Sequence, residues 1–303
     1  MWQRRQFLQS LGVLGLPFCG SSLAFETSEI PIERAIAATG QRIPVIGMGT
    51  WLTFDCANDA HALRIRVEVL RQFFAHGGAL IDSSPMYGSS QQALGLCLGE
   101  LEDPKLFSAT KVWTRGRGFG ERQMAKSARL WGLESFDLMQ VHNLVDIDTH
   151  LETLVAWKEA AQVKYVGATT SHGRRHDDLV RLMERGVLDF VQFTYNIIDR
   201  EAEQRLLPMA LERGIAVIVN RPFRASRVFD RVRGTKLPAW AADFDCENWA
   251  QFFLKFVVSH RATTCAIPAT SRVDHMIENM GALRGRLPDP AMRRRMTAYF
   301  DRL

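Results

Sequence analysis

The segment from Leu80 to Gly95 reads Leu-Ile-Asp-Ser-Ser-Pro-Met-Tyr-Gly-Ser-Ser-Gln-Gln-Ala-Leu-Gly and is the most informative part of this chain. Its apolar start predicts a short buried strand, and the serines before 91–100 predict a capped helix. Asp82 therefore closes a strand, and Tyr87 lies on the loop that leads to the helix. Because such loops often carry chemistry on a rigid scaffold, the pair is either a structural loop cap or half of an active site.

The composition limits the class of protein. The chain has 303 residues, of which 47% are hydrophobic and 23% charged, so it can bury a substantial core as one large barrel or two ordinary domains. The net charge of +5 and the isoelectric point near 9.1 are mildly basic, but the arginines are scattered rather than gathered in one block. No aromatic platform motif accompanies them, so we expect no nucleic-acid partner.

The N-terminal segment differs from the rest. Arg4-Arg5 precede an apolar run over 11–18 and small residues that end at Ala24. This order is typical of a twin-arginine signal peptide over 1–24, which predicts a periplasmic protein that uses the twin-arginine export machinery. The run is too short for a membrane span, and Cys19 does not stand in a lipoprotein box, so we expect no stable membrane anchor. The alternative is an amphipathic helix that stays on a cytoplasmic protein.

Four cysteines follow the expected cleavage point. They lack the close spacing of a metal knuckle or a redox Cys-x-x-Cys pair, so no metal site is predicted. Cys97 and Cys265 stand in apolar segments and are expected in the core. Cys56 and Cys246 stand in loop-like segments, and the sequence leaves open whether they form a disulfide in an oxidising compartment.

Strand-like runs and helical segments alternate over the remainder of the chain. After a strand or hairpin around 30–38, strands are expected at 45–51, 79–82, 106–111, 138–142, 163–168, 190–193, 215–220 and 264–268, and helices at 60–76, 91–101, 121–130, 149–161, 177–185, 201–213, 249–259 and 271–282. The strands are continuous and β-branched, which indicates a parallel sheet covered by helices. About eight such units fit one α/β domain over 25–303, a single (β/α)8 TIM barrel. An open doubly wound sheet is the second choice, because no Gly-x-Gly-x-x-Gly turn follows the first strand.

In a barrel, the carboxyl ends of the strands line one mouth, where active sites are found. The residues at these positions are Gly49, Thr50, Trp51, Asp82, Lys111, His142, Thr169, Thr170, Gln192, Asn220, Arg221 and Pro268. Three successive strand ends carry Asp82, Lys111 and His142, and Tyr87 lies on the loop beside the first of them. Perturbed ionisable groups gathered in a cleft mark functional sites, so we interpret these four residues as catalytic candidates.

These four groups suit proton delivery to a carbonyl. Lys111 ends a buried strand, and a buried ammonium needs a partner, which Asp82 provides at the neighbouring strand end. An ammonium close to a phenol lowers the pKa of that phenol, which predicts that Tyr87 exchanges a proton near neutral pH. His142 adds a donor for a carbonyl oxygen that gains negative charge. Such chemistry needs no metal.

Several motifs resemble the aldo-keto reductase superfamily, in order and spacing, over about 43–285. They are Gly49-Thr50-Trp51, Ile81-Asp82-Ser83-Ser84 with Tyr87-Gly88-Ser89, Thr110-Lys111-Val112, Leu138-Met139-Gln140-Val141-His142, and Ile267-Pro268 followed by Glu278-Asn279. The resemblance implies an NAD(P)H-dependent oxidoreductase that reduces an aldehyde or ketone to an alcohol by hydride transfer. It also implies that Tyr87 is the proton donor, that Lys111 and Asp82 tune it, and that His142 orients the carbonyl.

The resemblance also implies a set of cofactor-binding residues, some of which depart from the family pattern. The set is Gly49, Thr50, Trp51, Thr169, Thr170, Gln192, Asn220, Arg221, Thr270, Ser271, Glu278 and Asn279. Gln192 matches the glutamine that binds the nicotinamide carboxamide. Thr169-Thr170 stand where Ser-Asn is usual, and Asn220 stands where the family has an aromatic ring that stacks on the nicotinamide. Ring stacking would then depend on Phe223 or Trp51.

The phosphate positions depart further from the family. Near Pro268 the family has Lys-Ser and a later Arg that hold the 2′-phosphate of NADP, whereas this chain has Ala269-Thr270 and His275. Ser271 and Arg272 are displaced within the same loop. The family favours NADP, but a phosphate pocket needs fixed positive charge, so the cofactor is predicted as NADP or NAD.

The role of the segment 221–245 stays open. The arginines of this segment, at 221, 224, 227, 231 and 233, either cover the pyrophosphate of the cofactor or form a solvated surface. The short connection after His142 predicts an open mouth that tolerates many carbonyls, which leaves the substrate undefined. We expect a small carbonyl substrate and a monomer. The alternative function is a nicotinamide-dinucleotide-binding regulatory or sensor protein on the same barrel with little turnover, which the altered cofactor positions motivate.

Overall fold

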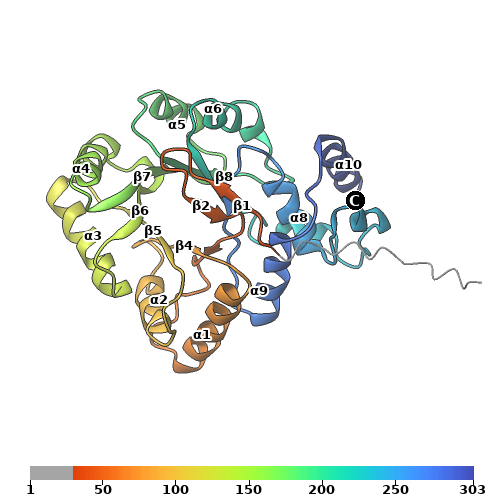
Figure 1. Cartoon of the computed structure of the whole chain (residues 1–303), viewed down its shortest axis with the longest axis horizontal. Helices are drawn as coiled ribbons and strands as arrows, with labels where there is room; N and C mark the ends of the chain where they lie inside the picture. The colour runs from red at the N-terminus through yellow and green to blue at the C-terminus, as the bar shows by residue number, and fades with distance from the viewer. Residues whose placement is uncertain (1–29) are drawn as a thin grey trace, which may run out of the picture.

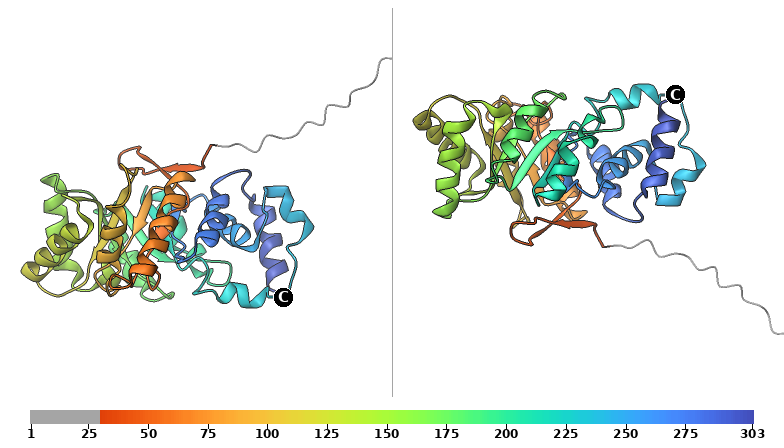
Figure 2. Two further views of the ribbon diagram at one scale, coloured as in Figure 1. Left: turned by 90° about the horizontal axis from the view of Figure 1, so that it is seen from below. Right: turned by 90° about the horizontal axis from the view of Figure 1, so that it is seen from above.

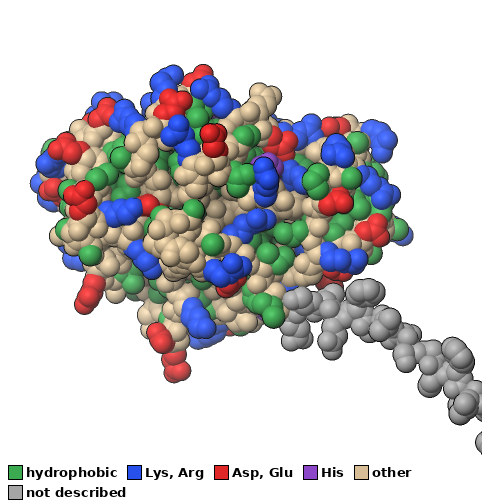
Figure 3. Space-filling view, turned by 45° about the horizontal axis from the view of Figure 1, so that its top comes forward, with side chains coloured by type: hydrophobic (Ala, Val, Ile, Leu, Met, Phe, Trp, Pro, Cys, Tyr) green, Lys and Arg blue, Asp and Glu red, His purple; other side chains and the backbone are tan. Residues whose placement is uncertain are grey.

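The computed structural model describes residues 30–303, so the predicted signal peptide at 1–24 lies outside the described residues. A ring of helices surrounds a central sheet, and a hairpin of β1 (Glu33–Ala35) and β2 (Arg42–Pro44) lies across one end of it (Figure 1). Basic and acidic side chains are interspersed over the face in Figure 3. No helix within 30–303 has the length and apolar character that crossing a membrane requires.

Eight parallel strands form one sheet in which neighbours follow the order of the chain. They are β3 (Met48–Gly49), β4 (Leu80–Asp82), β5 (Phe107–Val112), β6 (Phe136–Val141), β7 (Val163–Thr169), β8 (Phe190–Thr194), β9 (Ala216–Asn220) and β10 (Cys265–Ala266). The last strand meets the first, because Gly47 N donates to Ala266 O at 2.8 Å and Gly49 N donates to Pro268 O at 3.1 Å. The sheet is therefore a closed barrel, which confirms the predicted (β/α)8 fold.

Helices cover the outside of this barrel. They are α1 (Ala60–Ala75), α2 (Ser90–Leu98), α3 (Arg117–Trp131), α4 (Ile147–Glu159), α5 (His176–Met183), α6 (Leu206–Glu212), α7 (Arg227–Arg231), α8 (Trp249–Val258), α9 (Val273–Met280) and α10 (Pro290–Phe300), with the 3-10 turns η1 (His142–Leu144), η2 (Glu201–Glu203), η3 (Ala239–Phe244) and η4 (Gly281–Leu283). The Asp59 carboxylate caps α1 by accepting from two backbone N–H groups. Asn248 caps α8 in the same way through the Gln251 N–H. Such caps fix where each helix begins and so which residues stay in the loops.

Some helices differ from the prediction. The sequence predicts one helix over 201–213, but the structure divides it into η2 and α6. Proline lacks the N–H that a continuous helix would need at Pro208, so α6 begins at Leu206 and Pro208 falls in its first turn. The sequence pattern does not reveal α7, η3 or α10, and α10 lies at the outer side of the molecule beyond α8 (Figures 1 and 2).

The core has two apolar clusters. The larger packs helices against strands, and the smaller includes Leu80, Phe107, Leu138, Tyr165, Phe190 and Ile218 from the strands together with Ile36 and Ile43 from the hairpin region. The Tyr165 hydroxyl donates to Gln41 Oε1 at 2.9 Å, which ties the hairpin to the barrel. The hairpin therefore covers the amino ends of the strands and leaves the carboxyl ends as the accessible mouth (Figure 2).

Candidate active site

The predicted site residues meet at the carboxyl ends of the strands. Asp82 ends β4, Lys111 lies near the end of β5, and His142 directly follows β6. A cavity of about 360 Å³ opens there. The predicted residues that line it are Gly49, Thr50, Trp51, Asp82, Tyr87, His142, Thr169, Thr170, Gln192, Asn220, Arg221 and Pro268. Lys111 is completely buried and does not line the cavity.

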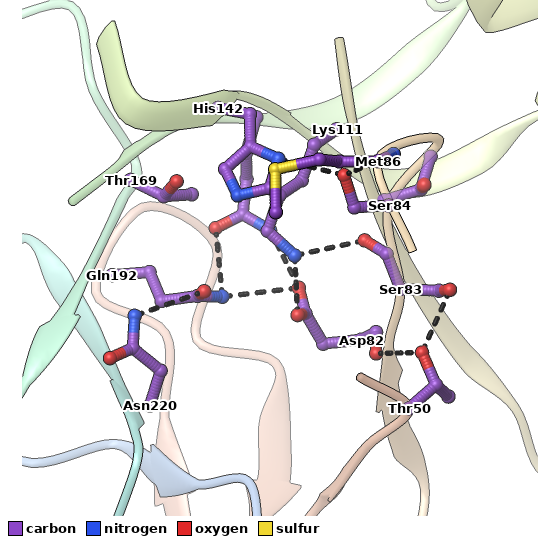
Figure 4. Close-up of polar contacts among 12 residues, drawn as sticks. Thr50, Asp82, Ser83, Ser84, Met86, Lys111, His142, Thr169, Gln192 and Asn220 are labelled. Atoms are coloured by element: carbon purple, nitrogen blue, oxygen red, sulfur yellow. Dashed lines mark hydrogen bonds and ion pairs between the residues drawn. The ribbon is translucent and has the colours of Figure 1, made fainter. Parts of the chain in front are cut away.

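Asp82 and Lys111 form a buried ion pair. Lys111 Nζ lies 2.5 Å from Asp82 Oδ2, and the two side chains are 0% and 2% exposed. The ammonium also donates to Ser83 O at 2.8 Å (Figure 4). Burial lowers the pKa of Lys111, and the charge of Asp82 opposes that shift. The predicted pairing is therefore confirmed, and each charge depends on the other.

The second carboxylate oxygen of Asp82 accepts two side-chain amides. Gln140 Nε2 lies 3.0 Å and Gln192 Nε2 lies 3.1 Å from Asp82 Oδ1. Gln140 is not among the predicted site residues, although it stands two residues before His142. Because alternate residues of a strand face the same side, this spacing is the signal that would have identified it.

The ring of Tyr87 lies close to both Lys111 and His142. Lys111 Nζ is 5.2 Å from the centre of the Tyr87 ring, and the Tyr87 and His142 rings meet edge to face with centres 5.7 Å apart. Burial raises the pKa of Tyr87, and the negative charge of Asp82 raises it further. The expected lowering of this pKa is therefore wrong, because burial, the larger cause, and the Asp82 charge both favour the protonated phenol.

His142 is held as a neutral imidazole. Burial, followed by the charge of Lys111, lowers the pKa of His142 to about 2. The Met86 N–H donates to Ser84 Oγ at 3.2 Å, so the Ser84 hydroxyl can give its own proton to His142 Nδ1, 2.7 Å away. With Ser84 as the donor, the ring proton of His142 lies on Nε2. In that tautomer His142 presents an uncharged N–H donor beside the cavity.

One wall of the cavity is an amide and hydroxyl network. Thr194 Oγ1 donates to Asn220 Oδ1 at 2.7 Å, and Asn220 Nδ2 donates to Thr170 O at 2.9 Å and to Gln192 Oε1 at 3.4 Å. These bonds hold Asn220 at the position where the resemblance expects an aromatic ring. Thr170 Oγ1 is buried and has no hydrogen-bond partner within the described residues. This wall therefore has one unsatisfied hydroxyl at the cavity.

Two other predicted hydroxyls are engaged by the protein itself. Thr50 Oγ1 bonds to Asp82 O at 3.1 Å and to Ser83 Oγ at 2.8 Å. Thr169 Oγ1 accepts from the Asn143 N–H at 3.2 Å. These hydroxyls therefore fix the loops at the strand ends.

Arg221 supplies a positive charge beside the cavity. Its backbone has a φ of 53°, a left-handed conformation that is uncommon for a residue with a side chain. Asn196 Nδ2 supports this conformation by donating to Arg221 O at 3.1 Å. The neighbouring Arg224 pairs with Asp199 at 3.3 Å, whereas no ion pair of Arg221 is found in the part of the chain that the structure describes. Burial lowers the pKa of Arg221, and an anion at this position would offset that cost.

Four predicted cofactor residues do not line the cavity. They are Thr270, Ser271, Glu278 and Asn279. Thr270 Oγ1 accepts from the Arg272 N–H at 3.1 Å, and the Arg272 guanidinium donates to Asp274 Oδ1 at 3.0 Å. The side-chain bond to Asp274 raises the pKa of Arg272, so this cation of the loop is already paired. Arg66 also reaches the loop, where its Nη1 donates to Ser271 O at 2.7 Å.

The cysteines and the metal-ligating residue types give no second site. Cys56, Cys97, Cys246 and Cys265 are all free thiols, so Cys56 and Cys246 are not paired in this structure. Burial raises the pKa of Cys246 to about 12. Within residues 30–303 no group of three or more His, Cys, Asp or Glu side chains could hold a metal ion.

A closed parallel barrel with ionisable groups at the carboxyl ends of its strands has the architecture of a TIM-barrel enzyme. A family model described as the aldo/keto reductase family matches residues 45–296. The chain therefore belongs to the aldo/keto reductase family and is an enzyme of that family.

Known relatives cover most of the same length. The chain is 23% identical over 300 residues to a probable aldo-keto reductase 1 from Glycine max, covering 85% of this chain and 86% of that protein. It is 26% identical over 226 residues to an NADH-specific methylglyoxal reductase from Escherichia coli, covering 65% and 68%. A solved aldo/keto reductase from Klebsiella pneumoniae, in complex with NADP and acetate, superposes with a TM-score of 0.72 at 21% identity and covers 86% of this chain and 93% of that one.

Proposed function

We propose that this protein is an NAD(P)H-dependent reductase that converts an aldehyde or ketone to an alcohol by hydride transfer. The observation that carries the proposal is the buried Lys111–Asp82 pair beside Tyr87, with His142 edge-on to the same ring. Asp82, Tyr87 and His142 line one cavity at the barrel mouth, and Lys111 is buried behind Asp82. Membership of the aldo/keto reductase family supports the same chemistry.

Tyr87 is the proton donor in this proposal. Hydride addition turns the carbonyl oxygen into an alkoxide, which is basic enough to take a phenol proton even when burial has raised the pKa of that phenol. The phenolate that remains lies near the Lys111 ammonium, 5.2 Å from the ring centre, and that charge stabilises it. Asp82 keeps Lys111 charged and in place.

His142 positions the carbonyl. Its pKa of about 2 keeps the imidazole neutral, and Ser84 at Nδ1 leaves the Nε2 proton available. A fixed N–H of this kind holds the carbonyl oxygen and stabilises the charge that develops on it. The hydrogen bond therefore strengthens as the reaction proceeds and does not require a proton to leave the imidazole.

The cavity wall fits a nicotinamide dinucleotide. When bound, the cofactor supplies the hydride. The unsatisfied Thr170 hydroxyl and the Gln192 side chain would hold the polar carboxamide, and Arg221 would hold an anionic phosphate. Asn220 replaces a stacking ring with an amide, so we expect weaker nicotinamide binding than a stacked site would give.

We further propose that NADH binds at least as tightly as NADPH. Arg272 is already paired with Asp274, so its charge is not free to hold a 2′-phosphate, and Arg66 donates to the backbone oxygens of Thr53 and Ser271. The Escherichia coli relative is named as NADH-specific. Titration of the intrinsic tryptophan fluorescence, to which Trp51 at the cavity contributes, with NAD⁺ and NADP⁺ tests this. A dissociation constant for NADP⁺ at least about tenfold below that for NAD⁺ would contradict it.

A dinucleotide-binding regulatory or sensor protein with little turnover is the second candidate. The observation that favours it is Asn220, which is locked by three hydrogen bonds at the position of the stacking ring. Weak stacking reduces the control over how the nicotinamide faces the substrate. Turnover of the cofactor separates the two functions.

The test is cofactor oxidation with a panel of aldehydes and ketones. Purified protein is incubated with NADH or NADPH and each carbonyl, and the loss of nicotinamide absorbance is followed. The reductase proposal predicts oxidation that depends on the carbonyl and on Tyr87. Binding of the dinucleotide without oxidation above that of the Tyr87→Phe variant would favour the sensor.

We also propose that the protein is exported to the periplasm through its Arg4-Arg5 segment. Twin-arginine export of folded proteins would let a cofactor bound in the cytoplasm travel with the enzyme. Fractionation of cells that express Arg4→Lys with Arg5→Lys tests the signal, because export should stop in that variant. Unchanged periplasmic recovery would argue against it.

A further inference from the structure

We propose that Gln140 is a positioning residue for the Lys111–Asp82 pair. Gln140 is completely buried in β6, and its Nε2 donates to Asp82 Oδ1 at 3.0 Å. It touches the carboxylate that holds the ammonium and does not line the cavity. The inference rests on the proposed reductase function, because it concerns the same catalytic pair.

The Asp82 carboxylate is held on both oxygens. Lys111 occupies Oδ2, while Gln140 and Gln192 both donate to Oδ1. The donors come from β5, β6 and β8, so they approach the carboxylate from three different strands. Hydrogen bonds to a buried charge are stronger than those between neutral groups. Gln140 therefore stabilises the ionised form of Asp82 and fixes which oxygen faces Lys111.

The barrel makes room for this glutamine. Gly167 stands opposite Gln140 in the register of β6 and β7. A Cβ at Gly167 would lie 2.9 Å from Gln140 Cγ and 3.1 Å from Phe190 O, which is too close for an undisturbed side chain. The glycine on the neighbouring strand therefore gives Gln140 the space in which to reach Asp82.

The same network reaches the cofactor wall. Gln192 Nε2 lies 3.4 Å from Gln140 Oε1, and Asn220 Nδ2 lies 3.4 Å from Gln192 Oε1. Figure 4 shows Asp82, Gln192 and Asn220 in one connected set of contacts. Gln140 thus supports Asp82 directly and Gln192 through its own oxygen.

Loss of the Gln140 donor changes the charge state of the pair. With one fewer bond to Oδ1, a proton shift from Lys111 Nζ to Asp82 becomes more favourable, in which an N–H bond breaks and an O–H bond forms. The total charge stays the same, but Lys111 becomes neutral. A neutral amine no longer stabilises the Tyr87 phenolate, so turnover falls while the carbonyl still binds at His142.

The experiment compares Gln140→Leu and Gln140→Glu with a matched control, Gln91→Glu. Gln91 is also a buried glutamine, but its Oε1 accepts from Thr110 and Trp131 and does not touch Asp82. We expect Gln140→Leu to lower kcat about tenfold at every pH, with the KM for the carbonyl within about twofold of the wild type. In Gln140→Glu the introduced acid donates to Asp82 when protonated and repels it when ionised. Its kcat should therefore be near the wild-type value at acidic pH and fall as the pH rises.

Thermal unfolding of the same variants gives a readout that does not need turnover. Burial and Asp82 raise the pKa of an acid introduced at position 140 in the folded state, so Gln140→Glu should lose stability as the pH rises above the unfolded pKa of that acid. Gln91→Glu lacks the carboxylate neighbour and should show a smaller loss. A Gln140→Glu profile parallel to the wild type in kcat, or a wild-type kcat in Gln140→Leu, would overturn the inference. Carbonyl reduction that survives Tyr87→Phe would instead overturn the proposed function.

Discussion

The Lys111 ammonium lies 5.2 Å from the centre of the Tyr87 ring, and its charge is balanced by Asp82, whose Oδ2 lies 2.5 Å from Lys111 Nζ. The ion pair as a whole therefore does not acidify Tyr87, whose pKa is raised by burial and by Asp82. In the proposed mechanism the ammonium acts after the proton has left, when it faces a negative phenolate. This order of events fits an enzyme that gives protons to its substrate.

A bias toward reduction follows from the raised Tyr87 pKa. The phenol stays protonated at neutral pH, so it can donate a proton to an alkoxide but cannot accept one from an alcohol. Carbonyl reduction should therefore proceed through the neutral range, and oxidation of the matching alcohol should rise with pH. Initial rates in both directions between about pH 6 and about pH 10 check this. An alcohol oxidation rate that peaks near neutral pH would contradict it.

The Ser84 hydroxyl should control the orientation of His142. Ser84→Ala removes the contact at Nδ1, 2.7 Å away, so the ring can turn or change tautomer. We expect kcat/KM for the carbonyl to fall about tenfold, which corresponds to about 1.4 kcal/mol. Ser84→Thr keeps a hydroxyl and should retain more activity. Equal rates in the two variants would remove Ser84 from the account.

The buried pair should be costly to break. Lys111→Met leaves the Asp82 carboxylate buried without its cation, and we expect the free energy of unfolding to fall by about 3–5 kcal/mol. Arg185→Met is the control, because Arg185 also pairs with an aspartate, Asp148 at 2.5 Å, but both of these side chains are exposed, at 50% and 75%. Urea unfolding should show a loss of about 1 kcal/mol or less for the control. Similar losses in both variants would contradict the buried-pair argument.

The charge of Arg221 should contribute to dinucleotide binding. Arg221→Gln keeps a polar side chain at the cavity but removes the cation, so the dissociation constant for NAD⁺ should rise about tenfold. Arg227→Gln is the control, because Arg227 is exposed and does not line the cavity. Fluorescence titration at low and high salt measures both. If the two variants bind NAD⁺ equally, the arginine segment is a solvated surface.

The barrel could be predicted because its strands are short apolar runs at regular intervals. Active sites of such barrels lie at the carboxyl ends of the strands, and this identified Asp82, Lys111 and His142. Local exceptions escaped this pattern. Pro208 breaks a helix that the periodicity alone would continue. Helix α10 begins with a side-chain cap from Asp289 and with Pro290. Both are helix-start signals, but α10 lies outside the eight strand–helix units, so it was not predicted.

The protonation states and contacts of the site residues are harder to predict than the identity of those residues. The direction of the Tyr87 pKa shift depends on burial and on the net charge beside the ring, and neither can be read from residue types. The role of Gln140 depends on the register of β6 against β7, which places it opposite Gly167. Sequence motifs identify which side chains lie at the mouth of the barrel. Three-dimensional contacts determine which charges lie next to them and so the directions of their pKa shifts.

Transfer of a labelled hydride tests the central claim most directly. Purified protein is incubated with NADH that carries deuterium at both C4 positions of the nicotinamide and with a carbonyl from the active panel, and the alcohol is analysed by mass spectrometry. The account predicts deuterium on the carbinol carbon with the wild type and little product with Tyr87→Phe. An unlabelled alcohol, or equal labelling by Tyr87→Phe, would contradict it.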